Sequence, residues 1–155
     1  MTKQQITINF ESYASLAELS KEDHELCNAA IKAMNESSYA PYSKFNVGAA
    51  VRLSNGVIVP GANQENLAFP SGLCAERTAM FAASAQYPNE RMCTIALVGG
   101  QNGEICPSPA TPCGACRQVM AEYQTKGGKN LAVIMIGANV IYRFEKVDDI
   151  LPLIF

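Results

Sequence analysis

Two short cysteine-containing segments constrain this chain more than any other feature. The first is Cys74-Ala75-Glu76-Arg77 and the second is Pro112-Cys113-Gly114-Ala115-Cys116-Arg117. Cys113 and Cys116 stand three positions apart, so they meet on one face of a helical turn. Three thiolates are suitable ligands for one zinc ion. If they bind the same ion, the fold must bring two distant segments together, each at or near a helix start.

The ligand count favours a catalytic metal over a structural one. A catalytic zinc keeps three protein ligands and leaves a fourth position for water. Cys74, Cys113 and Cys116 supply three ligands and no obvious fourth. Glu76 stands two residues after the first thiol, where a carboxylate is suited to moving protons between a metal-bound water and a substrate. A Pro-Cys-x-x-Cys element with an upstream ligand-x-Glu is typical of zinc-dependent deaminases, which replace an amino group on a ring carbon by hydroxide.

The charge of such a site needs an offset. Three thiolates and one Zn²⁺ leave a net negative charge, which opposes the formation of hydroxide on the metal. Helix N-termini favour thiolates, and Arg77 is the cation nearest to Cys74 in the sequence. We expect Arg77 to donate to the thiolate sulfurs and so to tune the metal. Arg117 is the alternative donor, or else a solvated helix residue.

A structural zinc site is the competing interpretation. Such a site closes with four ligands, and Cys93 and Cys106 are the available candidates. Cys93 lies in an apolar, strand-like run where a buried free thiol is common, so Cys106 is the better fourth ligand. A structural site gives no purpose to Glu76.

Composition narrows the class of substrate. The 155 residues suit one domain with a full core. The net charge of -2 and the pI near 5.4 argue against a nucleic-acid binder. The polar N-terminus predicts no signal peptide, and no apolar run approaches the ~18–20 residues of a membrane span. We therefore expect a cytoplasmic protein whose thiols stay reduced, with a small polar molecule as its substrate.

The periodicity predicts an α/β fold with a mixed sheet. Ser20 and Asp23 resemble a capping box at the start of a helix, and Asn55-Gly56 predicts a tight hairpin. Residues Gln5–Phe10 read as an edge strand or an extended arm. We expect strands at Val47–Leu53, Val57–Val59, Cys93–Val98 (ended by Gly99-Gly100), Leu131–Ile136 and Val140–Phe144, and further helices at Cys74–Gln86, Cys113–Gln124 and Val147–Leu151.

Taken together, these motifs resemble the small, homotetrameric type of cytidine deaminase over Asp23 to Phe155. The resemblance implies a three-layer α/β/α sandwich with a mixed five-stranded sheet, formed by residues 23–155 after an N-terminal arm, residues 1–22. It is carried by Tyr39-Ala40-Pro41-Tyr42-Ser43-Lys44-Phe45, Val47-Gly48-Ala49-Ala50, Asn63-Gln64-Glu65-Asn66, Cys74-Ala75-Glu76-Arg77-Thr78 and Pro112-Cys113-Gly114-Ala115-Cys116-Arg117-Gln118.

The resemblance also implies roles for single residues. One zinc ion per subunit would be held by Cys74, Cys113 and Cys116, and Glu76 would shuttle protons. The remaining implied contacts are to the substrate: Asn63 and Glu65 to the ribose 3′-hydroxyl, Phe45 near the base and sugar, the backbone N–H of Ala75 to the 2-oxo group, and Phe155 in the site of a neighbouring subunit.

The expected activity is the hydrolytic deamination of cytidine and deoxycytidine to uridine and deoxyuridine, in pyrimidine salvage. The alternatives are a deaminase of another aminopyrimidine nucleoside such as blasticidin S, a deaminase of a free base, an editing deaminase on nucleic acid, which the acidic pI disfavours, and a non-catalytic zinc module. Two features depart from many relatives: Phe69 stands where they carry tyrosine, and they lack the segment Met1 to Glu22.

Overall fold

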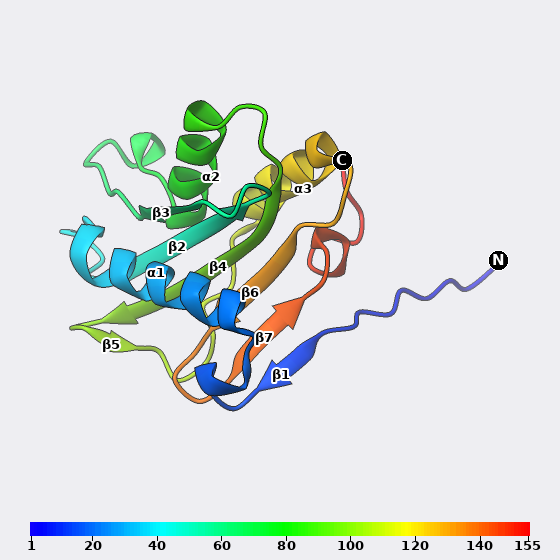
Figure 1. The fold of residues 1–155 in the computed structure, drawn as a ribbon, viewed down its shortest axis with the longest axis horizontal. Helices are drawn as coiled ribbons and strands as arrows, with labels where there is room; N and C mark the ends of the chain where they lie inside the picture. Colours follow the sequence, from blue (N-terminus) through cyan, green and yellow to red (C-terminus); the bar gives the residue numbers. More distant parts are fainter.

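A mixed seven-stranded sheet forms the middle of the molecule in this computed structural model, which describes residues 1–155. The strand order is β1-β7-β6-β4-β2-β3, with β5 attached to β4 (Figure 1). The strands β4 and β6 run parallel, and the other pairs run antiparallel. The strands are β1 (Glu11–Tyr13), β2 (Asn46–Leu53), β3 (Ile58–Ala62), β4 (Met92–Gln101), β5 (Glu104–Ile105), β6 (Ala132–Ile136) and β7 (Ile141–Phe144).

Helices cover both faces of the sheet, so the fold is a three-layer α/β/α sandwich (Figure 1). Alternate residues of each central strand face opposite layers. On β2, Val51 packs with α2 and α3, whereas Ala50 packs with α1. The helices are α1 (Lys21–Ser37), α2 (Ala75–Gln86) and α3 (Gly114–Gly127), and three short 3-10 helices span Leu16–Glu18, Phe69–Ser71 and Val147–Asp149. No helix combines the length and apolar character that a membrane crossing would need.

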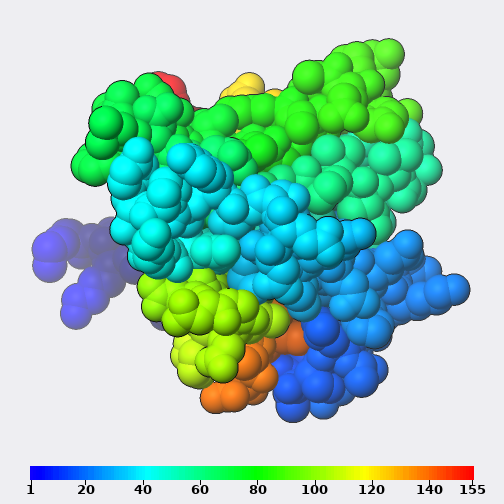
Figure 2. Space-filling view, turned by 90° about the vertical axis from the view of Figure 1, so that its left-hand side faces the viewer, coloured from blue at the N-terminus to red at the C-terminus, as the bar shows by residue number.

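The α/β class and the mixed sheet confirm the expectation, but the sheet has seven strands where five were expected. All five expected strands are present, while β1 adds an edge strand beside β7, and the short β5 pairs with the end of β4. The tight hairpin at Asn55-Gly56 is also present, with φ of 84° at Gly56. The segment Gln5–Phe10 lies outside any strand and runs outward as an extended chain that leads into β1 (Figure 1 and Figure 2).

The end of β4 was predicted wrongly. Gly99 and Gly100 do not terminate the strand, which continues to Gln101 and turns back through Asn102-Gly103 into β5. Both turn residues have positive φ, 55° and 79°, as a tight hairpin requires. The two glycines serve close approach instead: a Cβ on Gly99 would lie 2.8 Å from the ring of Phe45. The terminal helix expected at Val147–Leu151 is likewise shorter, a single 3-10 turn over Val147–Asp149.

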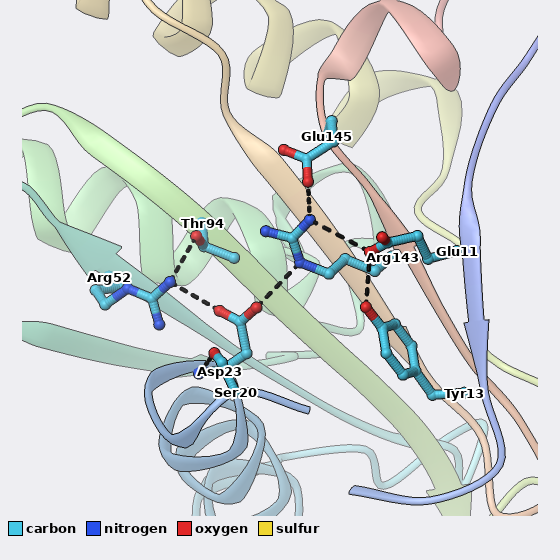
Figure 3. A network of polar contacts seen from close by, with 8 residues as sticks. All are labelled: Glu11, Tyr13, Ser20, Asp23, Arg52, Thr94, Arg143 and Glu145. Carbon is cyan, nitrogen blue, oxygen red and sulfur yellow. Dashed lines mark hydrogen bonds and ion pairs between the residues drawn. The ribbon is translucent and has the colours of Figure 1, made fainter. Parts of the chain in front are cut away.

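A buried ion-pair network joins α1 to the sheet on the face away from α2 and α3 (Figure 3). Asp23 is 5% exposed. Its carboxylate accepts from Nη2 of Arg52 on β2 at 2.8 Å and from Nε of Arg143 on β7 at 3.0 Å. The backbone N–H of Asp23 donates to Oγ of Ser20, which caps the helix. Arg143 also lies 3.7 Å from the carboxylate of Glu11, so the network reaches β1.

Replacing Asp23 with Ala is expected to lower the free energy of unfolding by about 3–5 kcal/mol, because the largely buried guanidinium of Arg52 loses its counter-ion and that of Arg143 keeps only the exposed Glu11 and Glu145. Urea denaturation of the purified protein measures this. Glu22→Ala is the matched control, since Glu22 is an exposed acid in the same helical turn, and should cost less than about 1 kcal/mol. Similar losses in the two variants would contradict the assignment of a structural role to the network.

Candidate active site

The starts of α2 and α3 bring the three predicted thiols together. Cys74 is the N-cap of α2, Cys113 is the N-cap of α3, and Cys116 lies in the first turn of α3. Their sulfur atoms all lie within 4.8 Å of one another. Three converging sulfur donors form a soft ligand set that fits zinc. Cys93 and Cys106 lie outside this cluster, so the structure provides no fourth cysteine ligand.

The environment already favours a thiolate at Cys74. Hydrogen bonds from Cys116, Arg77 and Cys113 together outweigh the opposing effect of burial and lower the pKa of the Cys74 thiol to about 5, with the Cys116 bond contributing most. The same hydrogen bond, together with burial, raises the pKa of Cys116. The first proton therefore leaves Cys74, and Cys116 keeps its own. A metal ion would replace this shared proton.

Arg77 is placed next to the first thiol. Its Nη2 donates to Sγ of Cys74 at 3.8 Å, which raises the pKa of the guanidinium. Arg117 neither donates a hydrogen bond to a cysteine sulfur nor points into solvent. Its Nε donates to the carbonyl of Pro112 at 2.9 Å, and its Nη1 donates to the carbonyl of Ile150 at 3.0 Å. Arg117 thus ties the start of α3 to the C-terminal segment.

Glu76 is a buried carboxyl beside the cysteine cluster. It lies in the first turn of α2 and is 4% exposed. Burial raises the pKa of Glu76, and the nearby charge of Cys74 raises it further. A carboxyl with a raised pKa can both take up and return a proton under conditions where an ordinary glutamate stays ionised.

A cleft of about 800 Å³ joins the cysteine cluster to the other predicted residues. Its wall includes Cys74, Glu76 and Cys113, and three of the predicted substrate contacts, Phe45, Asn63 and Glu65. Ala75 is fully buried as the first residue of α2, where a backbone N–H has no intrahelical partner. Phe155 does not line the cleft of its own chain and is fully exposed.

Hydrogen bonds orient the amide of Asn63. Its Oδ1 accepts from the backbone N–H of Val47 at 2.9 Å and from the hydroxyl of Ser38, and its Nδ2 donates to the carbonyl of Phe45 at 2.8 Å. One N–H of the amide is left for another acceptor. No sequence signal pointed to the contribution of Ser38, because this contact joins residues 25 positions apart.

Glu65 is anchored to the same loop as Phe45. Its Oε2 accepts from the backbone N–H groups of Tyr42 at 2.8 Å and Ser43 at 3.2 Å. A hydrogen bond from the Ser43 side chain, with support from these backbone N–H groups, lowers the pKa of Glu65. The carboxylate is therefore ionised, and Oε1 has no partner within the chain. Asn63 and Glu65 together offer one donor and one acceptor to the cleft.

Comparison with known proteins identifies the family. Residues 20–129 match the profile of the cytidine and deoxycytidylate deaminase zinc-binding region. The chain belongs to this family.

Individual relatives support the same assignment. The cytidine deaminase of Halalkalibacterium halodurans is 44% identical over 97 residues, which are 63% of this chain and 68% of that protein. The cytidine deaminase of Mycobacterium tuberculosis is 36% identical over 115 residues, 74% and 76% of the two chains. The crystal structure of the cytidine deaminase from Burkholderia pseudomallei superimposes with a TM-score of 0.69 at 40% identity, covering 85% of this chain and 98% of that one.

Replacing Arg77 with Gln should weaken zinc binding by about 10- to 100-fold, as is typical when a hydrogen-bond partner of a metal ligand is lost. Because the pKa of Cys74 then rises, zinc should also leave at a higher pH as the solution is acidified. Competition with a chromogenic chelator across a pH series measures both effects. Arg117→Gln is the control, since its guanidinium contacts carbonyls and not sulfur. Equal zinc retention in the two variants would rule out the proposed role of Arg77.

Proposed function

We propose that the protein hydrolytically deaminates cytidine and deoxycytidine to uridine and deoxyuridine in pyrimidine salvage. One zinc ion per subunit would be held by Cys74, Cys113 and Cys116. The observation that carries this proposal is the position of Glu76, a buried carboxyl that shares one cleft with two of the three thiols. Its burial also disfavours the non-catalytic zinc module, which has no use for a costly buried carboxyl.

Glu76 would act as the proton carrier of the reaction. Zinc held by the three cysteines would supply Lewis acidity, which would lower the pKa of a water molecule and make it a better nucleophile. Glu76 takes a proton from the attacking water and gives it to the ring nitrogen next to the amino-bearing carbon. It then takes the remaining proton from the newly added hydroxyl, which becomes the carbonyl oxygen of the product, and delivers that proton to the amino group, which leaves as ammonia. The raised pKa of Glu76 suits both directions of transfer.

The other wall of the cleft would hold the nucleoside. A sugar hydroxyl is both a hydrogen-bond donor and an acceptor. It can therefore accept a hydrogen bond from the free N–H of Asn63 and donate one to Oε1 of Glu65. These residues therefore favour a ribose-bearing substrate over a free base. Phe45 supplies an apolar surface for the base and sugar, and the unpaired N–H of Ala75 is suited to the 2-oxo group.

We further propose a homotetramer in which Phe155 of one subunit enters the cleft of a neighbour. Large apolar side chains that lack cover support this assembly: Leu67 and Phe69, close to the cleft, are 76% and 74% exposed, and Leu153 near the C-terminus is 82% exposed. Apolar exposure on this scale is typical of subunit contacts. A cytoplasmic location is consistent with the need for three reduced thiols.

Replacing Glu76 with Gln should reduce kcat by about 10²–10⁴-fold while zinc stays bound, because the amide cannot carry protons. The change in ultraviolet absorbance as cytidine becomes uridine measures turnover, and metal analysis measures zinc. In the wild type, activity should fall on the acid side at a pH above the usual range of a glutamate, since protonated Glu76 cannot act as the base.

The exposed Glu104→Gln on β5 is the control for Glu76→Gln and should keep wild-type turnover. If the wild type holds zinc and deaminates none of cytidine, deoxycytidine, cytosine and blasticidin S, the structural zinc module becomes the better assignment.

Replacing Glu65 with Gln should lower kcat/KM for cytidine and deoxycytidine by about 10- to 100-fold, because a charged hydrogen bond to the sugar is lost. Both nucleosides carry the 3′-hydroxyl, so both should respond. Free cytosine is the matched control substrate, since it has no sugar to lose. An equal loss on cytosine would show that Glu65 acts through the fold of the loop and not through the sugar. Preferred turnover of blasticidin S would favour the alternative nucleoside.

A further inference from the structure

The N-terminal segment Lys3–Tyr13, which we call the arm strand, joins the extended N-terminus to the edge strand β1. Residues 1–10 make no hydrogen bond within the chain, and both views show this segment projecting from the body (Figure 1 and Figure 2). It leads directly into β1, which is an edge of the sheet and pairs only with β7. An edge strand that continues into an unpaired extended segment is a template for pairing with another strand.

The arm strand carries one apolar face. Ile6, Ile8 and Phe10 alternate with polar residues, and they are 58%, 48% and 51% exposed. Phe10 packs against the body of its own chain, with the rings of Tyr142 and Phe144 at 5.2 and 5.0 Å. The apolar row thus begins on the sheet at Phe10 and continues along the projecting segment, where about half of the surface of Ile6 and of Ile8 remains exposed.

We propose that the arm strands of two copies of this chain pair antiparallel about a two-fold axis through Ile8. In this register Ile8 lies opposite Ile8 of the second copy. Ile6 of each copy lies opposite Phe10 of the other. All three apolar residues are then matched across the pair on one face, which is the arrangement that stabilises antiparallel strands.

Charge supports the same register. Lys3 is the only charged side chain of residues 1–10, and Glu11 is the first acid after it. With Ile8 on the axis, Lys3 lies opposite Tyr13 of the second copy and diagonal to Glu11, within reach of a long side chain. The open edge of β1 is covered by residues 3–5 of the second copy. A single-chain explanation leaves both the apolar row and this edge uncovered.

The arm strand precedes the part of the chain that matches the family profile. The Burkholderia pseudomallei structure is covered over 98% of its length while only 85% of this chain is matched, and the family match begins at residue 20. The proposal does not depend on the assigned activity, because no residue of the arm strand lines the cleft.

Disulfide trapping of the zinc-loaded protein tests the pairing. Ile8→Cys places two thiols on the axis and should give a covalent dimer under mild oxidation, seen on a non-reducing gel and absent from the wild type. Thr7→Cys is the matched control, because Thr7 lies off the axis on the opposite face. No dimer with Ile8→Cys, or equal dimer with Thr7→Cys as expected of a loose tail, would overturn the proposal.

Amide hydrogen exchange gives a second readout that needs no new cysteine. Residues 4–10 should exchange at least about tenfold more slowly in the wild type than in Ile8→Asp, where two carboxylates would meet on the axis. Exchange at the rate of an unstructured peptide in the wild type would overturn the pairing. Slow exchange without the Ile8→Cys dimer would assign the arm strand to the body of the protein and would equally overturn it.

Discussion

The candidate site depends on two helix starts being held side by side on one face of the sheet. Three sulfur atoms can come within 4.8 Å only if α2 and α3 begin at the same point. The sheet achieves this through very close backbone approach. A Cβ on Gly61 of β3 would lie 2.4 Å from the backbone nitrogen of Ala79 on α2, so α2 lies almost directly on the strand. Because the backbones are in such close contact, even a small shift of α2 relative to the sheet would disturb the positions of the three sulfur atoms.

A second wall of the cleft is organised by a single loop. Residues 39–45 are held by two polar side chains. Asn63 donates to the carbonyl of Phe45, and Glu65 accepts from the N–H groups of Tyr42 and Ser43. The two polar groups available to a ligand are therefore also the groups that hold the loop. Recognition of a sugar hydroxyl and the shape of the cleft depend on the same four side-chain hydrogen bonds to this loop and to β2.

Local signals predicted the parts of the molecule that local physics controls. Cys74 and Cys113 were expected at helix starts and are N-caps, and Asn55-Gly56 was expected to form a hairpin. The same Asn-Gly pair at Asn102-Gly103 also forms a hairpin, although Gly99-Gly100 favoured an earlier end to the strand. The partners of Asp23 and Arg117 lay beyond sequence reasoning, since they come from distant elements and only the folded topology brings them together.

The choice of cysteine as N-cap has a thermodynamic consequence. Serine or aspartate would accept a hydrogen bond from the first turn, but neither Cys74 nor Cys113 makes such a bond. The first turn of α2 carries Ala75, Glu76 and Arg77. Under the proposed zinc ligation, the ion would act as a common cap of the two helices, and metal uptake would be coupled to the ordering of Glu76.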